Sequence, residues 1–510
     1  MLENLAATML ASAAERPDAA AVRHGDRVIS YAELAALSAR FAGRLVEHGV
    51  RPGDRVGLML PNVLQFPVAY FGILRAGAIV VPMNPLLRDE VRYYLSDSGA
   101  RLLCAAPADG PAGDVAAAAA TAGAELLLAD DAMLQADAPG TAFADVARAG
   151  ADTAVILYTS GTTGKPKGAE LSHDNLRRNA EICARSLLRL TPGDVVFGAL
   201  PLFHSIGQTS AMNAGFAAGA ELTLTPRFEP AAALGLIEAH GVTVFIGVPT
   251  MYVGLLAAAG DRSAGGVASS LRLCVSGGAS LPAEVLRRFE QRFEATILEG
   301  YGLSETSPVA SFNHLEGLRK PGSIGTPIEG VSIRLLDGDG NPVAMGDVGE
   351  IAIKGHNVMT GYWQRPQETA AAMRDGWFLS GDLARVDEDG YYFIVDRKKD
   401  LIIRGGLNVY PREVEEVLYT HPAVAEACVR AVPDERLGEE IGAAVVLREG
   451  HVAGEKELAA YVKARLAPYK YPRVIWFADA LPKNATGKIL RREVQPPASV
   501  VQRRASAPAG

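Results

Sequence analysis

The sequence predicts an α/β protein with a large N-terminal domain of mixed sheets and helices plus a β region, followed by a small α+β C-terminal domain. Strand-like apolar runs alternate with helical stretches as far as Pro249. Short strands and turns replace this alternation after Gly330, and the charged stretch Asp396–Asp400 precedes a last compact segment ending near Val494. A chain of 510 residues is also too long for one hydrophobic core.

The alternation begins with a strand–helix–strand unit. Arg55–Leu60 has the composition of a buried strand, a helix is expected after Pro61, and Ala78–Pro82 reads as the next strand. Later runs with the same strand character are Arg101–Cys104, Ala154–Leu157 and Val242–Pro249. The Ala-rich segment from residue 105 to 151 carries little pattern, so we expect surface helix and loop there.

The second half of the chain changes in texture. Val331–Leu336 and Gly349–Ile353 are strand-like and flank the turn Asp337–Gly340, which predicts a small β region. We therefore assign residues 1–396 to the N-terminal domain and 397–494 to the C-terminal domain. Residues 495–510 are rich in Pro, Ala, Ser and Arg and are expected to be disordered.

Composition excludes several classes of protein. A formal net charge of −8 disfavours a general nucleic-acid binder. The four cysteines form no CxxC pair, which indicates neither a zinc site nor a disulfide framework and suits a reducing cytoplasm. The N-terminus has Glu3 and Glu15 but no basic stretch, so no secretory signal is expected. Pro67 and Arg75 interrupt the apolar region Phe66–Met83, which predicts a helix and a buried strand rather than a transmembrane segment.

The most informative segment is Tyr158–Gly168, which directly follows a predicted buried strand. Its small residues let backbone N–H groups approach phosphate oxygens, its hydroxyls add donors, and Lys165 and Lys167 add positive charge. It is not a Walker A loop, because Gly161 and Gly164 are too close together and a proline stands where Ser or Thr is needed. A phosphate-binding loop is the favoured interpretation, and a plain polar turn is the alternative.

Four further segments have chemistry typical of a nucleotide site. Ser276–Pro282 offers a flat backbone that can pack against a planar base. Glu299–Thr306 combines an aromatic ring, a hydroxyl and a carboxylate that suit stacking, a phosphate contact and a Mg²⁺ ligand. Trp377–Asp382 ends in a carboxylate after a tight turn, and Pro482–Leu490 places a lysine on a glycine-bearing turn. Each segment alone also fits a structural role in core packing, a turn or a solvated face.

Together and in this order, the five segments resemble the acyl-adenylate-forming superfamily, which includes acyl-CoA synthetases, luciferases and the adenylation domains of peptide synthetases. The resemblance extends from about Thr8 to Val494. It implies an enzyme that uses ATP and Mg²⁺ to convert a carboxylic acid into acyl-AMP and then transfers the acyl group to a thiol. It also implies that the small C-terminal domain is mobile and rotates between the two steps.

The resemblance assigns ATP-binding residues position by position. The residues implied to hold the β- and γ-phosphates are Thr159, Ser160, Gly161, Thr162, Thr163, Gly164, Lys165 and Lys167. Those implied to surround the base and the ribose are Gly277, Gly278, Ala279, Gly300, Tyr301, Gly302, Asp382 and Arg397. Within this second group, Asp382 and Arg397 would hold the ribose hydroxyls, and the others would enclose the adenine.

The resemblance also implies catalytic residues. Lys488 would bridge the carboxylate and the α-phosphate during adenylation. Glu305 would bind Mg²⁺, with Thr159 as a second ligand. Ser304 stands where the family most often has Thr beside the α-phosphate, and its hydroxyl preserves the role.

The expected acceptor is coenzyme A. The resemblance places Lys399 at the hinge between the domains, and Gly405 and Gly406 along the path of the pantetheine arm. Residues 467–494 carry six basic and two acidic side chains, a local +4 that suits the phosphates of the coenzyme. No carrier domain is expected after Val494.

The acid is expected to bind at an apolar channel. The residues implied to line it are His204, Ile206, Val248 and Thr250, with Gly207, Met212 and Met251 as further candidates. His204 occupies the position of the Asp in amino-acid-activating relatives, and Gly300 that of an Arg in malonate synthetases. An apolar channel favours a medium- or long-chain fatty acid. An aryl acid such as coumarate or benzoate, and then malonate, remain as alternatives.

Two further readings come from other functional classes. A luciferase-like oxygenase would often end in a peroxisomal signal, whereas this sequence ends in Pro508–Gly510. A stand-alone adenylation protein without turnover would be expected to lose Lys488 or Glu305, and both are present. The expected location is cytoplasmic, and the oligomeric state stays open, with a homodimer as one candidate.

Overall fold

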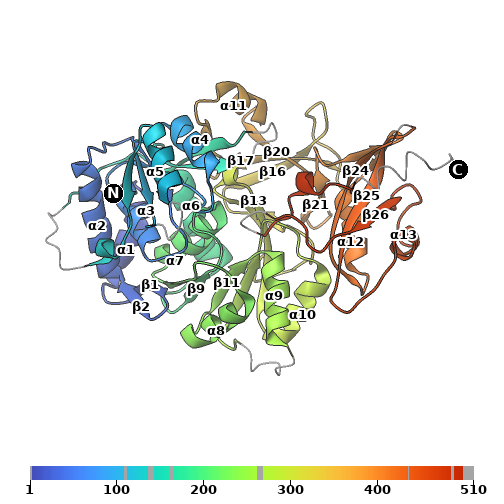
Figure 1. Ribbon diagram of the computed structural model, residues 1–510, viewed down its shortest axis with the longest axis horizontal. Helices are drawn as coiled ribbons and strands as arrows, with labels where there is room; N and C mark the ends of the chain where they lie inside the picture. The colour runs from blue at the N-terminus through green and yellow to red at the C-terminus, as the bar shows by residue number, and fades with distance from the viewer. Residues whose placement is uncertain are drawn as a thin grey trace. The chain divides into compact units, whose positions relative to one another are not determined.

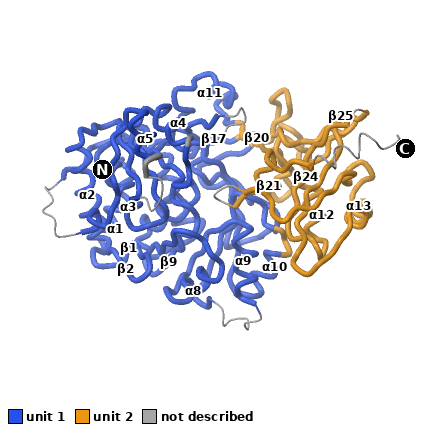
Figure 2. Tube along the Cα trace, in the orientation of Figure 1, with its two compact units in different colours: residues 1–281, 285–333, 353–378 blue, residues 282–284, 334–352, 379–510 orange. Residues whose placement is uncertain are grey.

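The computed structural model describes residues 3–107, 112–135, 143–159, 165–260, 268–434, 436–483 and 487–497. The chain folds into two compact units, each described here by itself (Figure 2). Unit 1 comprises residues 1–281, 285–333 and 353–378, and unit 2 comprises residues 282–284, 334–352 and 379–510. The predicted domain boundary between residues 396 and 397 refers to the rotation of the C-terminal domain between the two reaction steps, so it stays a prediction.

The first sheet of unit 1 has a parallel centre (Figure 1). Its order is β15 (Thr326–Pro327), β14 (Val309–Phe312), β13 (Thr296–Gly302), β12 (Leu273–Ser276), β11 (Val244–Gly247), β9 (Val195–Gly198), β10 (Glu221–Leu224), β1 (Ala20–His24) and β2 (Arg27–Ser30). The strands from β13 to β1 run parallel, while β14, β15 and β2 are antiparallel additions at the two edges. The carboxyl ends of the parallel strands therefore lie along one edge, where α/β proteins place ligand sites.

The second sheet of unit 1 carries the predicted phosphate loop. Its order is β18 (Gly361–Tyr362), β8 (Lys167–Ser172), β7 (Thr153–Thr159), β4 (Ile79–Pro82), β3 (Arg55–Met59), β5 (Leu102–Ala105) and β6 (Glu125–Leu128). The strands from β7 to β6 are parallel. In contrast, β8 is antiparallel to both β7 and β18. The phosphate loop thus joins two antiparallel strands, and no helix begins at its end.

The helices of this part of the chain are α1 (Ala6–Glu15), α2 (Tyr31–Glu47), α3 (Gln65–Arg75), α4 (Asp89–Ser98), α5 (Ala112–Thr121), α6 (His173–Ile182), α7 (Ala214–Ala217), α8 (Pro230–His240), α9 (Pro249–Ala259), α10 (Ala283–Phe293) and α11 (Pro366–Ala372). Helix α2 illustrates why they form. Ser30 and Glu33 make a reciprocal capping box at its start. Leu34, Leu37 and Phe41 then lie buried on one face.

Most predicted elements are confirmed. The predicted strands before Pro61, at Ala78–Pro82, at Arg101–Cys104, before the phosphate loop and before Pro249 correspond to β3, β4, β5, β7 and β11. The apolar region from residue 66 to 83 forms α3 and β4, and no described helix is long and apolar enough to cross a membrane. All four cysteines are buried and free.

One segment differs from the prediction of surface helix and loop. Residues 105–151 do contain α5, but also strand β6, which pairs with β5 in parallel register. Leu127 is buried while Glu125 and Leu128 are exposed. This alternation is typical of a half-buried edge strand, but it spans only four residues. The surrounding alanines carry no periodic signal that would have distinguished it.

Unit 2, which contains the orange and red elements α12, α13 and β24 to β26 of Figure 1, has its own buried core. One sheet has the order β23 (Leu407–Val409), β22 (Ile402–Arg404), β25 (Gly438–Leu447) and β24 (Val424–Asp434), with β26 (Val474–Phe477) beside β25. Helices α12 (Pro411–Tyr419) and α13 (Glu455–Lys463) contribute Val414, Leu418, Leu458 and Val462 to its buried cluster. The predicted β region corresponds to a further sheet whose residues are divided between the two units: β16 (Val331–Leu336), β17 (Gly349–Gly355), β19 (Met373–Arg374), β20 (Trp377–Val386) and β21 (Tyr392–Arg397).

Candidate active site

The two ends of the predicted phosphate loop are held by the paired strands β7 and β8 of the second sheet. Thr159 ends β7 and pairs in register with Lys167, the first residue of β8. Lys165 and Lys167 each lie over an aromatic ring: their Nζ atoms are 5.9 Å from the ring centroid of Tyr93 and 5.2 Å from that of Tyr362, respectively. The predictions for Ser160, Gly161, Thr162, Thr163 and Gly164 fall outside the described residues.

Helix α4 supplies a support for this loop that the sequence analysis missed. Tyr93 donates a hydrogen bond of 2.7 Å to the carbonyl of Pro166. Tyr94 stacks on Tyr158 with ring centroids 4.5 Å apart, and Tyr158 donates to Asp97 at 2.8 Å. Burial, with that carboxylate beside it, raises the pKa of Tyr158. The aromatic pair at positions 93 and 94 was visible in the sequence, but its contact with the loop depends on the packing of α4.

Glu305 lies buried beside the loop, as the prediction of a metal ligand requires. Its Oε1 accepts a hydrogen bond of 2.9 Å from the Tyr362 hydroxyl and one of 3.4 Å from the Thr159 hydroxyl. The other oxygen, Oε2, accepts no hydrogen bond from any described residue. Burial and the nearby Glu305 carboxylate raise the pKa of Tyr362, so this phenol is a donor. The sequence analysis did not identify Tyr362.

A tight turn presents Ser304 and Glu305. Both belong to a short 3₁₀ helix, Ser304–Thr306, directly after β13. The turn closes on Gly302, because a Cβ there would lie only 1.7 Å from the carbonyl oxygen of Pro308. Thr306 locks it further, since its hydroxyl donates to that same carbonyl at 2.6 Å and accepts the backbone N–H of Leu303 at 2.9 Å. The local sequence therefore fixes where Glu305 points.

The predicted adenine-binding residues lie at the carboxyl ends of adjacent parallel strands. Gly277 follows β12, and Gly300 and Tyr301 lie at the end of β13. A Cβ built on Gly277 would be 3.7 Å from the carbonyl oxygen of Gly300, so the two segments are in close contact. Gly278 has a φ of +76°, a conformation that glycine adopts without strain. Gly278 and Ala279 are exposed, which leaves this backbone open to a planar ligand.

The predicted acyl-binding residues meet the predicted adenine-binding loop. A Cβ built on Gly278 would lie 3.6 Å from Val248 and 3.8 Å from Ile206. His204 is half-buried just before the π-helix Ile206–Asn213, and its Nδ1 is 3.5 Å from the backbone nitrogen of Ile206. Thr250, in the first turn of α9, is exposed. The structure thus places Ile206 and Val248 near Gly278, whereas no described contact joins Thr250 to this group.

Gly207 shows how closely this region is packed. A Cβ at Gly207 would be 2.3 Å from the carbonyl oxygen of Pro201, so only glycine fits there. The π-helix that contains Gly207 buries Met212 together with the polar side chains of Gln208, Thr209 and Asn213. An apolar acyl-binding region therefore stays a prediction.

Unit 2 collects the remaining predicted site residues. Asp382 on β20 and Arg397 on β21 are register partners, and their side chains form an ion pair of 3.0 Å. Asp382 is almost fully buried. Lys488 lies close enough to both for their charges to act on it: burial and then Arg397 lower its pKa to about 8, while Asp382 and Asp400 oppose this shift. Asp382 and Arg397 therefore form an ion pair whose charges act on Lys488 within the same unit.

Lys399 and the glycine pair have different surroundings. Lys399 lies largely exposed in the turn after β21, and partial desolvation of its amine together with the charge of Arg397 lowers its pKa. Gly405 and Gly406 form the exposed turn between β22 and β23, with φ values of +57° and +83°. Two successive positive φ angles explain why glycine occupies both positions.

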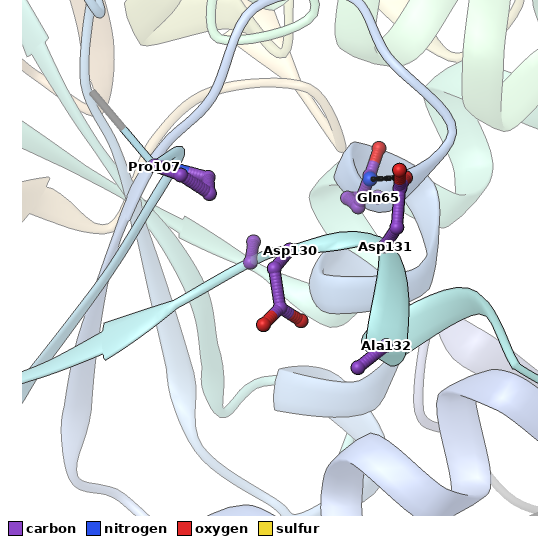
Figure 3. A pocket seen from close by; sticks show the side chains of 6 residues that line it. Gln65, Pro107, Asp130, Asp131 and Ala132 are labelled. Atoms are coloured by element: carbon purple, nitrogen blue, oxygen red, sulfur yellow. Dashed lines mark hydrogen bonds between the residues drawn. The ribbon is translucent and has the colours of Figure 1, made fainter. Parts of the chain in front are cut away.

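The surface hollow drawn in Figure 3 is not part of this arrangement. It has a volume of about 450 Å³ and is lined by Gln65, Pro107, Ala129, Asp130, Asp131 and Ala132. Gln65 donates to Asp131 at 3.4 Å. Two carboxylates without a lining lysine or arginine do not suit a triphosphate. A second hollow of about 450 Å³ is lined by residues that include Glu170, Tyr362 and Arg365.

Comparison with known proteins identifies the family. The model of the AMP-binding enzymes matches residues 10–363, and that of the AMP-binding enzyme C-terminal domain matches residues 413–488. The chain belongs to the AMP-binding enzymes. It is 38% identical over 95% of its length to a long-chain-fatty-acid–CoA ligase of Bacillus subtilis, covering 92% of that protein. It is 42% identical over 94% of its length to a feruloyl-CoA synthase of an Amycolatopsis species, covering 96% of it.

A solved structure agrees with this assignment. ATP-bound MatB from Rhodopseudomonas palustris superimposes with a TM-score of 0.90 at 36% identity, covering 96% of this chain and 98% of that one. The predictions of the acyl-adenylate-forming family, of its α/β fold and of an enzyme of the AMP-forming acyl-CoA synthetase type are confirmed. The relatives' names differ in the acid they specify, so they leave the acid open.

Proposed function

We propose that this enzyme joins a carboxylic acid to coenzyme A in two steps, through an acyl-AMP intermediate made from ATP. The observation that carries this proposal is the proximity of Gly278 to Ile206 and Val248: a Cβ on Gly278 would lie within 3.8 Å of both side chains. Adenylation requires the acid and the nucleotide to meet, and here Val248, expected for the acid, and Gly278, expected for the nucleotide, follow the carboxyl ends of the paired strands β11 and β12.

The first step brings two anions together. An oxygen of the acid attacks the α-phosphorus of ATP, and pyrophosphate leaves with the electron pair of the broken P–O bond. Positive charge must therefore face the α-phosphate as negative charge develops there. In this proposal the Lys488 ammonium supplies it, Ser304 donates to an α-phosphate oxygen, and Lys165 and Lys167 hold the departing phosphates.

Mg²⁺ fits the residues present. Glu305 Oε2 accepts no hydrogen bond from the described residues, and the Thr159 hydroxyl lies beside the same carboxylate. Among the described residues there is no group of three or more His, Cys, Asp or Glu side chains that could hold a metal ion. Mg²⁺ is commonly bound by one or two protein oxygens together with substrate phosphates. Glu305 and Thr159 would hold it, and it would supply charge neutralisation at the phosphates.

The nucleoside is held by separate groups. In this proposal the adenine lies between the Gly277–Ala279 backbone and the Tyr301 ring, flanked by Gly300 and Gly302. Asp382 and Arg397 hold the ribose hydroxyls, and their ion pair orients the carboxylate. These contacts orient the α-phosphorus for attack, which lowers the entropic part of the barrier.

In the second step the thiol of coenzyme A attacks the acyl carbonyl and AMP leaves with the electron pair of the broken C–O bond. The hinge at Lys399 and the exposed turn Gly405–Gly406 serve this step by letting the pantetheine arm approach. The turn suits a narrow path because glycine adds no side chain to it. Coenzyme A is the proposed acceptor because the relatives are named CoA ligases and synthases.

For the acid we favour a medium- or long-chain fatty acid. The residues implied for the acyl group, Ile206, Val248, Met212 and Met251, have apolar side chains, and the last three are buried. Each methylene buried against such side chains contributes about 0.8 kcal/mol. An aryl acid is the second candidate, favoured by the 42% identity to a feruloyl-CoA synthase. Gly300 offers no cation for the second carboxylate of malonate, which makes that acid a weaker candidate.

A pyrophosphate-release assay over a panel of acids tests the proposal. Fatty, aryl and dicarboxylic acids are each supplied with MgATP, with and without coenzyme A. We expect slow pyrophosphate release without the coenzyme, and multiple turnovers with formation of a thioester and AMP when it is present. Formation of ADP, or the absence of any acid-dependent pyrophosphate release, would contradict the proposed chemistry.

A further inference from the structure

We propose that Tyr362 is a positioning residue that holds the Glu305 carboxylate in the orientation needed to bind the metal ion. This inference rests on the proposed function, in which Glu305 is a Mg²⁺ ligand. Tyr362 is half-buried on the short strand β18, and the sequence analysis gave it no role.

The hydrogen bonds of Glu305 are distributed unevenly between its two oxygens. The Tyr362 hydroxyl and the Thr159 hydroxyl both donate to Oε1, at 2.9 and 3.4 Å. No described residue donates to Oε2. The backbone of Glu305 is fixed as well, since its carbonyl accepts the N–H of Met359 at 2.8 Å. One oxygen is therefore tied to the protein while the other is left to a ligand.

Tyr362 is itself held firmly. Strand β18 pairs with β8, so that Tyr362 lies opposite Ala169. The backbone N–H of Tyr362 donates to the Thr369 hydroxyl of α11 at 2.9 Å. A side chain fixed at both its backbone and its hydroxyl can define the rotamer of the carboxylate that it contacts.

The same aromatic ring also contacts the phosphate loop. Lys167 Nζ lies 5.2 Å from the Tyr362 ring centroid, within the range of a cation–π interaction. Lys167 in turn is the register partner of Thr159. Tyr362 thus links the loop lysine to the carboxylate, which sets the spacing between the group that meets the phosphates and the group that meets their metal ion.

The test removes only the hydroxyl, with Tyr362→Phe. The control is Tyr31→Phe, which also removes a buried tyrosine hydroxyl, in this case one that donates to the carbonyl of Ala220 at 2.8 Å. Tyr31 lies at the start of α2 and has no proposed role in binding. Mn²⁺ is the probe, and its binding is titrated by electron paramagnetic resonance in the presence of α,β-methylene-ATP, which cannot be adenylated.

We expect Tyr362→Phe to weaken Mn²⁺ binding by about tenfold, the lower end of the effect of losing a group that orients a metal ligand. Binding of the nucleotide without metal should change by less than about twofold, since no hydrogen bond of the loop is lost. Excess Mg²⁺ should restore most of the adenylation rate. Thr369→Val, which releases the backbone of Tyr362 instead, should weaken Mn²⁺ binding to a smaller extent. Equal melting temperatures establish that the variants fold.

Glu305→Gln separates this inference from the proposed function. If Glu305→Gln weakens Mn²⁺ binding and adding Tyr362→Phe to it has no further effect, the positioning role is supported. If Glu305→Gln weakens binding but Tyr362→Phe does not, or if the Tyr31→Phe control weakens it equally, the positioning role is overturned and the proposed function stands. If Glu305→Gln has no effect, the metal-ligand role of Glu305 fails and the positioning role fails with it.

Discussion

Arg397 Nε lies 3.0 Å from Asp382 Oδ1, and the two residues face each other in the register of β20 and β21. Asp382 is almost fully buried, so the guanidinium provides the counter-charge that keeps an ionised carboxylate tolerable there. The pairing also places Arg397 where its charge lowers the pKa of Lys488. The expected ribose site and the expected catalytic lysine are therefore electrostatically coupled.

The first prediction concerns this carboxylate. Asp382→Asn should weaken ATP binding by about tenfold or more, because a hydrogen bond to a charged group contributes about 1.5–3 kcal/mol. The variant should also lose discrimination between ATP and its 2′- or 3′-deoxy analogues. Glu440→Gln is the control, since Glu440 forms a similarly buried pair with Arg404 in the same unit. Unchanged discrimination in Asp382→Asn would remove Asp382 from the ribose site.

The second prediction separates the two half-reactions. Lys488→Ala should slow formation of acyl-AMP by roughly 10²–10³-fold, the scale for removing one transition-state donor. Supplied with synthetic acyl-AMP, the variant should still form the thioester at nearly the normal rate. Lys463→Ala serves as the control, because Lys463 at the end of α13 lies outside the basic stretch 467–494 and has no proposed role. An equal loss in both half-reactions would argue against a role confined to adenylation.

The third prediction follows from the lowered pKa of Lys488, about 8. Only the protonated amine carries the positive charge, so kcat/KM for ATP in adenylation should fall as the pH rises through about 8. Thioester formation from acyl-AMP should show no such fall. In the unfolded chain this lysine has its normal, higher pKa. Between the pKa of about 8 in the folded protein and that higher value, the unfolded chain therefore binds more protons, and the free energy of unfolding rises with pH in this range. Lys488→Arg should remove the fall in activity, and an unshifted profile would contradict the assignment.

Functional groups that are adjacent in the chain could be predicted from the sequence, whereas contacts between segments far apart in the chain could not. The glycines, hydroxyls and carboxylates of Glu299–Thr306 are adjacent in the chain, and their turn is closed by neighbours such as Gly302 and Pro308. Tyr362 reaches Glu305 only because β18 pairs with β8, a long-range register that no local pattern specifies. Tyr93 likewise reaches Pro166 only through the packing of α4.

The exposure of individual side chains was equally hard to predict. Ile206 and Val248 were expected to line one region, and both do approach Gly278. Thr250 was expected beside them but is exposed at the start of α9. Because helix α9 begins at Pro249, the side chain of Thr250 leaves the backbone in a different direction from that of Val248, two residues earlier. Such a change of direction is invisible to an assignment made residue by residue from sequence motifs.

The fourth prediction concerns the hinge. Lys399→Pro fixes φ and restricts the residue before it. The backbone N–H of Lys399 donates no hydrogen bond to the described residues, so the substitution should not unfold the chain. If the C-terminal domain must rotate about this residue, acyl-AMP should accumulate and thioester formation should fall. Lys399→Ala removes the charge alone and should form thioester normally. Unchanged thioester production by Lys399→Pro would place the pivot elsewhere.

The last prediction concerns the acid. If Ile206 and Val248 border an apolar channel, kcat/KM should rise with each added methylene until the channel is full and then fall. The ceiling is about 0.8 kcal/mol per methylene, or about fourfold per carbon.

Val248→Phe should shift the optimum to shorter acids, because Val248 lies next to Gly278 and a larger ring would occupy the channel. Val253→Phe is the control, since Val253 is exposed on the neighbouring helix. Assays from acetate to stearate, beside malonate, benzoate and coumarate, measure this directly. A preference for an aryl acid over every alkanoate would favour the second candidate and leave the adenylation chemistry intact, because the nucleotide contacts do not depend on the acyl chain.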